Sequence, residues 1–189
     1  MKFRTDAMMS VAVASLSASV GVAGAAVYDE AVDGDLASVA DGPTGFDVEI
    51  GVNSVFGTVG DDGSLDEDFI GFVIEADEAL TAIILTSFVP SGGNTSTGFR
   101  LYADLGSGYE QVSSGSIDTG DVGVNFLDVW NLADVGGSAP LGPGSYGVVL
   151  AEFTPNQAYS FDIVVIPAPG VLGLAGMGGI AMLRRRRTA

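Results

Sequence analysis

The feature that most constrains this chain is a series of short runs in which apolar and polar residues alternate between turn residues. The run Phe46-Asp47-Val48-Glu49-Ile50 is the clearest, because it places apolar side chains on one face and acidic side chains on the other. Alternation with a period of two is typical of a half-buried strand. Nine runs of this kind predict strands at residues 46–50, 54–59, 69–76, 80–89, 99–103, 109–113, 124–132, 145–153 and 159–166.

Together these runs predict an all-β domain of about nine strands, folded as an antiparallel β-sandwich or jelly roll. The longest apolar runs, 69–76 and 80–89, are predicted to be central strands. A helix is conceivable over residues 29–39, but Gly34 and the surrounding acidic residues favour an irregular segment at an edge. The domain would extend over residues 27–166, which is enough chain for one hydrophobic core.

The acidic residues are concentrated in the middle of the chain. Residues 27–166 hold 23 of the 24 acidic residues but only Arg100 of the 7 basic ones, which gives this region a net charge of −22. Such a surface repels nucleic acid and anionic lipid, since both are bound through lysine and arginine. The charge favours cations, basic proteins or neutral polymers as partners, or it serves solubility in a salty medium.

Cysteine and histidine are both absent from the chain. Disulfides, zinc sites of the usual Cys/His type and nucleophiles activated by histidine are therefore excluded. Two carboxylates could still hydrolyse a glycosidic bond, and Glu75 and Asp128, which lie beside apolar residues, are the candidates for a general acid. Because so acidic a chain contains many carboxylate pairs by chance, we expect a protein that is not an enzyme and has no catalytic residues.

The N-terminus has the parts of a secretory signal peptide. Lys2 and Arg4 precede an uncharged stretch of small and apolar residues, 7–24. Ala23 and Ala25 then form a small-x-small cleavage pattern, which acidic chain follows at once. We predict a signal peptide of residues 1–25 that is helical and is removed by cleavage after Ala25 or Ala26. The alternative is an uncleaved anchor or a buried helix.

The C-terminus also has three parts. Pro167, Ala168 and Pro169 form a rigid segment that does not suit a helix. Residues 170–183 are uncharged and apolar, and they predict a transmembrane helix. A helix of 14 residues is about 21 Å long, so snorkelling and local thinning must make up the difference from the ~30 Å hydrocarbon core. The positive charges that follow should stay in the cytoplasm and leave the domain outside; they are Arg184, Arg185, Arg186 and Arg187.

This tail, residues 167–189, resembles the PEP-CTERM sorting signal of Gram-negative and related bacteria. Pro167 and Pro169 match the two prolines of that motif, and Ala168 replaces its glutamate. The resemblance implies recognition by an exosortase, a membrane transpeptidase that cuts near the motif and sorts the protein to the envelope or beyond. It also implies an association with exopolysaccharide production. The alternative is a plain tail anchor that is never cut.

A second resemblance lies within the domain. Asp66-Glu67-Asp68 leads into the apolar run 69–74, and Pro143-Gly144-Ser145-Tyr146 opens a late strand. This pair of segments is similar to pre-peptidase C-terminal-type β-sandwich modules, which are non-catalytic accessory domains of secreted bacterial proteins. Some of these modules bind calcium or polymer. The resemblance implies a β-sandwich.

Two groups of side chains are candidates for binding a ligand. The acidic loop could supply oxygen ligands to Ca²⁺, although its spacing is not that of an EF-hand and a solvated loop is the favoured alternative. The aromatic side chains could stack on sugar rings, although packing in the core is the favoured alternative. The calcium candidates are Asp61, Asp62, Asp66, Asp68 and the adjoining Glu67; the aromatic candidates are Trp130, above all, with Tyr102, Tyr109, Tyr146 and Tyr159.

These observations predict a secreted, non-enzymatic β-sandwich protein that is sorted to the outer envelope, the cell surface or the extracellular matrix. Its expected role is structural or associated with an exopolysaccharide matrix. Its expected partners are an exosortase, extracellular polysaccharide and, before processing, the inner membrane through the C-terminal helix; nucleic acid is not expected. The alternatives are a dedicated carbohydrate- or calcium-binding module, with Ca²⁺ as its only cofactor, and a carboxylate-dependent glycan hydrolase.

Overall fold

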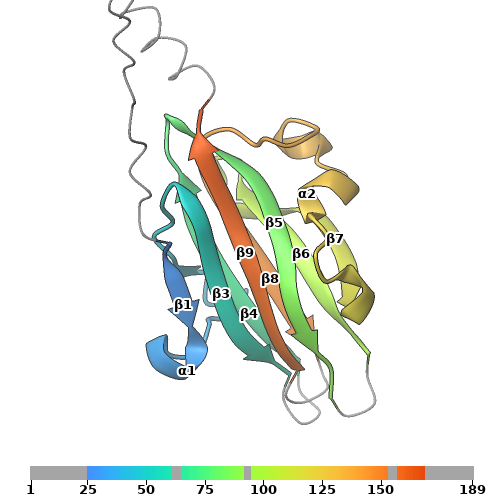
Figure 1. The fold of residues 1–189 in the computed structure, drawn as a ribbon. Coiled ribbons are helices and arrows are strands. Elements are labelled where there is room, and N and C mark those ends of the chain that lie inside the picture. The colour runs from blue at the N-terminus through green and yellow to red at the C-terminus, as the bar shows by residue number, and fades with distance from the viewer. Residues whose placement is uncertain (1–24, 61–64, 92–94, 153–156, 169–189) are drawn as a thin grey trace, which may run out of the picture.

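The structure is a computed structural model, and it describes residues 25–60, 65–91, 95–152 and 157–168. Within these ranges the chain is mostly β and forms nine strands in two sheets (Figure 1), which confirms the predicted all-β class and number of strands. The strands are β1 (Val27–Asp29), β2 (Thr44–Gly45), β3 (Gly51–Val59), β4 (Asp66–Ile74), β5 (Glu78–Val89), β6 (Ser96–Asp104), β7 (Tyr109–Asp118), β8 (Gly144–Glu152) and β9 (Gln157–Pro167). The short helical elements are α1 (Glu30–Asp33), η1 (Thr119–Asp121), α2 (Phe126–Val129) and η2 (Ala133–Val135).

The long strands pair in a nested order. One sheet has the order β1-β3-β9-β5 and the other has the order β2-β4-β8-β6-β7. Thus β6 pairs with β7, β4 with β8 and β3 with β9, all antiparallel, as if one long hairpin had been rolled up. The outer edge of β5 is bridged at Leu80 to Leu141 and at Ile84 to Asn125. Residues 119–142 therefore occupy the place of a further strand beside β5, as Figure 1 shows for α2.

The two sheets pack face to face over one core. Alternate residues of each strand point inward, and five of the largest side chains on this face are at most 2% exposed: Phe72, Phe99, Phe126, Phe161 and Ile83. The rings of Phe99 on β6 and Phe161 on β9 meet edge to face, with their centroids 6.1 Å apart. Because these strands belong to different sheets, this contact closes the interior directly. The arrangement fits a β-sandwich.

The sheets are mixed, so the prediction of a purely antiparallel fold was wrong at two edges. Strand β1 pairs with β3 in parallel, and β2 pairs with β4 in parallel. Parallel neighbours need a connection long enough to bring the chain back to its starting end, and residues 30–50 provide it between β1 and β3. The segment from β1 to β2 thus leaves one sheet and joins the other on the side where β3 and β4 face each other.

Two predicted strands are not strands. In residues 46–50 the alternation is real, since Phe46 is buried and Asp47 is exposed. The backbone of this segment is held by individual contacts, however, and the side chain of Asn53 bonds both the N–H and the C=O of Glu49. The short strands β1 and β2, which alternation did not predict, bring the number back to nine.

The other wrong strand is residues 124–132, which contain α2. Asn125 begins this helix because its Oδ1 accepts from the N–H of Leu127, and the same oxygen accepts from the N–H of Ile83 on β5. Phe126, Leu127 and Trp130 then pack on the core with helical rather than alternating spacing. One polar side chain therefore caps the helix and also satisfies the edge of the neighbouring strand.

Two further expectations concern position. Strand β5, predicted to be central, is the last strand of its sheet. Residues 29–39 contain only the one-turn helix α1, as an irregular edge segment requires. In the described residues no helix is long and apolar enough to cross a membrane. The predicted signal helix and the predicted transmembrane helix of residues 170–183 lie outside the described residues.

Candidate functional site

Three carboxylates converge where the N-terminal segment passes from one sheet to the other. Glu30 belongs to α1, Asp35 follows this helix, and Asp68 lies on β4. One oxygen from each side chain can be chosen so that all three lie within 4.8 Å of one another. We refer to Glu30, Asp35 and Asp68 as the acidic trio.

Asp68 is the buried member of the trio. It is in phase with Ile70, Phe72 and Ile74 on β4, so its side chain points between the sheets and is 1% exposed. Neither carboxylate oxygen has a hydrogen-bond partner of ordinary geometry among the described residues. Burial, reinforced by the negative charge of Glu30, raises the pKa of Asp68 to about 8. Asp68 therefore holds a proton near neutral pH, although its interaction with the Tyr159 hydroxyl opposes the shift.

Glu30 is half-buried and fixed in place. Its Oε2 accepts from the backbone N–H of Thr58 on β3 at 2.6 Å, and its Oε1 accepts from the N–H of Leu36 at 3.2 Å. Asp29 caps the helix by accepting from the N–H of Ala31. Burial raises the pKa of Glu30, although these backbone bonds oppose the shift. The carboxylate thus completes the edge of β3 beyond the point where β1 ends.

Tyr159 completes the buried part of the site from the opposite sheet. The residue is 3% exposed. Its hydroxyl has no hydrogen-bond partner of ordinary geometry in the described chain. The ring lies against Gly57 on β3: a Cβ added there would be 2.5 Å from Tyr159 Cζ and 2.9 Å from Glu30 Oε2. Burial, followed by the charges of Asp68 and Glu30, raises the pKa of Tyr159 well above its ordinary value. The hydroxyl therefore stays neutral and faces the trio.

A surface cleft gives access to this group. Its volume is about 560 Å³, and Glu30, Asp35, Gly57 and Tyr159 are on its wall. Asp35 is exposed, whereas Asp68 is not among the lining residues. Solvent can therefore reach the trio from the side of Asp35, with Asp68 at the inner end.

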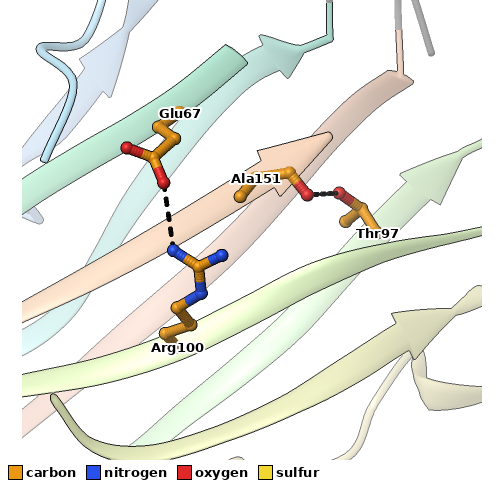
Figure 2. Close-up of polar contacts among 4 residues, drawn as sticks. All are labelled: Glu67, Thr97, Arg100 and Ala151. Carbon is orange, nitrogen blue, oxygen red and sulfur yellow. Dashed lines mark hydrogen bonds and ion pairs between the residues drawn. The ribbon is translucent and has the colours of Figure 1, made fainter. Parts of the chain in front are cut away.

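The single basic residue of the domain lies elsewhere. Arg100 on β6 reaches across β8 to Glu67 on β4, with 3.0 Å between Nη1 and Oε1 (Figure 2). Glu67 alternates with Asp68, so the pair lies on the opposite face of the sheet from the trio. Figure 2 also shows Thr97, whose hydroxyl donates to the C=O of Ala151 at 2.9 Å. No side chain in the described part of the chain neutralises the trio.

The chemistry available to the trio is binding of a cation or sharing of a proton. In retaining glycosidases the two carboxyl groups lie about 5–5.5 Å apart with the sugar between them. Here the three oxygens lie within 4.8 Å, and Asp68 is not on the cleft wall. Because the buried Asp68 does not line the cleft, it cannot protonate a sugar bound there, and the site gives no support to the glycan hydrolase alternative.

The predicted calcium ligands that the structure describes make different contacts. Asp61 and Asp62 lie outside the described residues. Asp66 accepts from the N–H of Gly60 at 2.8 Å, while Glu67 pairs with Arg100. Asp68 alone joins a cluster, and it does so with Glu30 and Asp35, which the sequence analysis missed. Asp68 alternates in step with Ile70 and Phe72, which indicates from the sequence that its side chain points inward. No sequence pattern indicates that Glu30 and Asp35 lie beside it.

The other candidates are distributed over the surface and the core. Glu75 and Asp128 are both exposed, so neither has the apolar surroundings that a general acid needs. Asp128 accepts from Asn125 Nδ2 at 2.9 Å. The four tyrosines are half-buried or buried: Tyr102 and Tyr109 pack on Phe69, Tyr146 packs near Phe72, and Tyr159 packs near Phe161.

Trp130 has two environments. One face stacks on Phe126 with a centroid distance of 4.9 Å and an interplanar angle of 17°. The residue is partly exposed, and it lines a second cleft of about 390 Å³. The polar residues of this cleft are Gln111, Ser113, Ser114 and Asn131. The indole is thus both a core residue and part of a polar groove.

The processing residues fall mostly outside the described ranges: Ala23, Pro169, Arg184, Arg185, Arg186 and Arg187. Ala25 is described and exposed. Pro167 is the last residue of β9, opposite Glu78, and the N–H of Ala168 donates to the C=O of Asp77 at 2.7 Å. The first two residues of the Pro-Ala-Pro segment therefore continue the sheet.

Comparison with known proteins identifies no relative: no protein-family model matches the chain, and a search of curated proteins finds no match.

Proposed function

We propose that this chain is a secreted, non-enzymatic β-domain that a PEP-CTERM-like tail sorts to the cell surface, where it serves a structural role in an exopolysaccharide matrix. The observation that carries the proposal is the connection between domain and tail. Strand β9 extends to Pro167, and Ala168 is still bonded to Asp77. The motif thus begins directly at the end of the sheet, which suits a tail that is cut from a folded domain.

The proposed processing is tested by the intact mass of the mature protein, measured separately in membrane and culture-fluid fractions. The expected mass lacks the signal peptide and the residues beyond about Pro169. A membrane-bound form that retains Arg184 to Arg187 would contradict sorting and leave a plain tail anchor. Deletion of residues 184–187 is the matched control, because it should leave the domain intact and abolish release.

The nested strand pairing also supports a scaffold. We infer a jelly roll in which residues 119–142 replace one strand. In a single rolled hairpin β6 pairs with β7, residues 119–142 lie beside β5, β4 pairs with β8 and β3 pairs with β9. Jelly rolls serve as capsid and lectin domains, so the fold is compatible with a structural or polymer-binding role. The fold alone does not specify either role.

The cleft at Trp130 is where we propose that neutral polysaccharide makes contact. An indole edge beside Gln111, Ser113, Ser114 and Asn131 combines an apolar surface with hydroxyl and amide groups. A domain with a net charge of −22 disfavours acidic polymers, so the expected polymer is neutral. The test is retention of the full-length chain on a panel of neutral and acidic polysaccharides in 150 mM NaCl, a concentration of about physiological strength.

The variants Gln111→Ala and Asn131→Ala are preferred to a change at Trp130, which would disturb packing on Phe126. Both should retain the fold and elute earlier from the neutral polymer than the parent chain does. Ser107→Ala, on an exposed turn and outside the lining of the cleft, is the control. Unchanged retention of the two cleft variants would remove this contact from the proposal.

A further inference from the structure

We propose that Glu30, Asp35 and Asp68 bind a calcium ion at the side of the domain where the N-terminal segment passes between the sheets. Three of their oxygens lie within 4.8 Å of one another. Two oxygens on the same Ca²⁺ are at most about 4.6–5.2 Å apart, since each Ca–O distance is about 2.3–2.6 Å. One ion can therefore contact all three side chains with little rearrangement. This site is separate from the tail and from the Trp130 cleft, so it does not depend on the proposed function.

Clustered acidic side chains alone would not justify this assignment, because exposed carboxylates often gather without a ligand. Here the innermost member is 1% exposed, and both of its oxygens lack a hydrogen-bond donor of ordinary geometry among the described residues. The hydroxyl of Tyr159, from the other sheet, is buried beside it; the two groups interact with each other, but neither forms a hydrogen bond of ordinary geometry with a described residue. Buried polar groups in folded proteins are almost always bonded, and where the protein supplies no partner an ion or a water molecule usually does. Two such groups facing one acidic cluster point to a bound ion.

The charge of the chain supports the same conclusion. Between residues 5 and 183 the sequence contains one basic residue, Arg100. It is bonded to Glu67 on the opposite face of the sheet from Asp68. That stretch therefore offers no second basic side chain to offset the negative charge of the trio. A hard divalent cation from solution supplies the missing charge and accepts oxygen ligands.

The arrangement favours Ca²⁺ over Mg²⁺. Mg²⁺ demands near-ideal octahedral geometry and keeps several waters, whereas Ca²⁺ tolerates irregular sets of six to eight oxygens. The three carboxylates come from α1, from the loop after it and from β4, and the Glu30 oxygens also accept backbone N–H groups. Such a set is irregular, and Asp35 leaves one side open for water ligands. A bound ion would tie the crossing segment to β4.

In the first test the full-length chain is stripped of metal with EDTA and the EDTA is removed. The chain is then titrated with CaCl2 and, in a parallel experiment, with MgCl2. The buffer contains 150 mM NaCl, so that diffuse attraction to the acidic surface is screened. We expect saturable binding of Ca²⁺ near one ion per chain, in the range of about 0.1–1 mM that is usual for extracellular modules. Saturating Ca²⁺ should also raise Tm by a few degrees, and Mg²⁺ should do so less.

The variants separate this site from diffuse binding. Asp35→Asn removes one ligand. The Asp35 side chain is exposed and makes no hydrogen bond to the described residues, so we expect this variant to fold like the parent chain. Asp134→Asn removes the same charge away from the trio, because η2 lies beside β7, which is at the opposite edge of the sheet from β2 and β4. We expect Asp35→Asn to weaken Ca²⁺ binding at least tenfold and Asp134→Asn to leave it within twofold. Equal affinities of the two variants, or no saturable binding up to 10 mM Ca²⁺, a concentration about ten times the weakest expected Kd, would overturn the proposal.

A second readout places the ion inside the domain. Tb³⁺ replaces Ca²⁺ in oxygen sites, and a tyrosine within a few ångströms sensitises its emission. The parent chain should show this emission through Tyr159 and Tyr28, which both lie near the trio, and excess Ca²⁺ should remove it. Asp68→Asn, whose far-UV circular dichroism confirms that it is folded, should show at most a tenth of the emission. Full emission from folded Asp68→Asn would also overturn the assignment.

Discussion

Asp68 on β4 and Tyr159 on β9 come from opposite sheets, yet their polar groups face each other in the interior, where neither has a hydrogen-bond partner of ordinary geometry among the described residues. An unsatisfied buried polar group costs roughly 1–3 kcal/mol. The rest of the domain must offset this cost, unless a ligand does. A ligand that bonds these groups would therefore stabilise the folded domain.

The burial of Asp68 predicts how stability depends on pH in EDTA. Its folded-state pKa of about 8 lies above the unfolded value, so the folded chain holds a proton that the unfolded chain loses between these values. Stability is therefore fully present below about pH 4 and declines as pH rises toward 8, at most by about 1.4 kcal/mol per unit. The charges of Glu30, Asp66 and Asp35 act in the same direction, and the Tyr159 hydroxyl opposes them.

Urea unfolding at pH 5 and pH 8 in EDTA measures this effect. The free energy of unfolding should fall by roughly 2–4 kcal/mol over this interval. Asp68→Asn cannot titrate and should show a clearly smaller fall, while Asp134→Asn should behave like the parent chain. A fall of the same size in Asp68→Asn would assign the pH dependence to the general acidity of the surface.

Gly57 is predicted to be intolerant of any side chain. Its missing Cβ leaves the space that Tyr159 occupies, and Gly57→Ala would bring the methyl group to 2.5 Å from Tyr159 Cζ. Displacing a buried ring costs about 1–3 kcal/mol. Thermal unfolding should show a lowered Tm for Gly57→Ala. Gly45→Ala is the control, since its Cβ would meet nothing within 4 Å; an equal loss in both would contradict the steric explanation.

Asn53 is predicted to be the most sensitive polar residue of the core. It is fully buried, and its amide bonds the backbone of Glu49 twice, the C=O of Ile163 and the N–H of Ala26. Asn53→Ala leaves these groups unpaired and should cost about 2–4 kcal/mol in the free energy of unfolding. Asn131→Ala, on the surface, should cost less than about 1 kcal/mol. A loss below 1 kcal/mol at Asn53 would show that water replaces the amide.

The same contacts predict where the signal peptide is cut. The C=O of Ala26 accepts from the N–H of Ser54 at 2.9 Å, and its N–H donates to Asn53 at 3.3 Å. Cleavage after Ala25 keeps both contacts, whereas cleavage after Ala26 removes them. N-terminal sequencing of the mature protein should therefore begin at Ala26. A mature chain that begins at Val27 would contradict this choice.

Local pattern was a good guide to the long strands and a poor guide to the two segments whose backbone bonds are made by side chains. Strands β5, β6, β8 and β9 lie where alternation predicts them, because each buries one face against the other sheet. Residues 46–50 alternate as well, yet the amide of Asn53 bonds that backbone in place of a neighbouring strand. In residues 124–132, the side chain of Asn125 likewise accepts from a backbone N–H, that of Ile83 on β5.

The candidate site was predictable in one member only. The sequence shows that Asp68 shares the parity of Ile70 and Phe72, so an inward carboxylate follows from the pleat alone. Glu30 and Asp35 lie more than 30 residues away and meet it because two parallel edge strands, β1 and β2, carry the chain past β4. Strands this short have too few residues to show an alternating pattern of apolar and polar side chains. They pair where β3 and β4 leave backbone N–H and C=O groups free at the edge of a sheet.

By itself, the sequence determined the β class, the absence of thiol and imidazole chemistry, the concentration of negative charge and the three-part form of each end. These properties depend on composition and on neighbours along the chain. Only the tertiary structure decided the mixed sheets, the different contacts of Asp66, Glu67 and Asp68, and the convergence of Asp68 with Glu30 and Asp35. The physical reason is that these outcomes depend on which strand edges pair and on which face of a sheet each residue lies, and both are fixed when the two sheets pack over their common core.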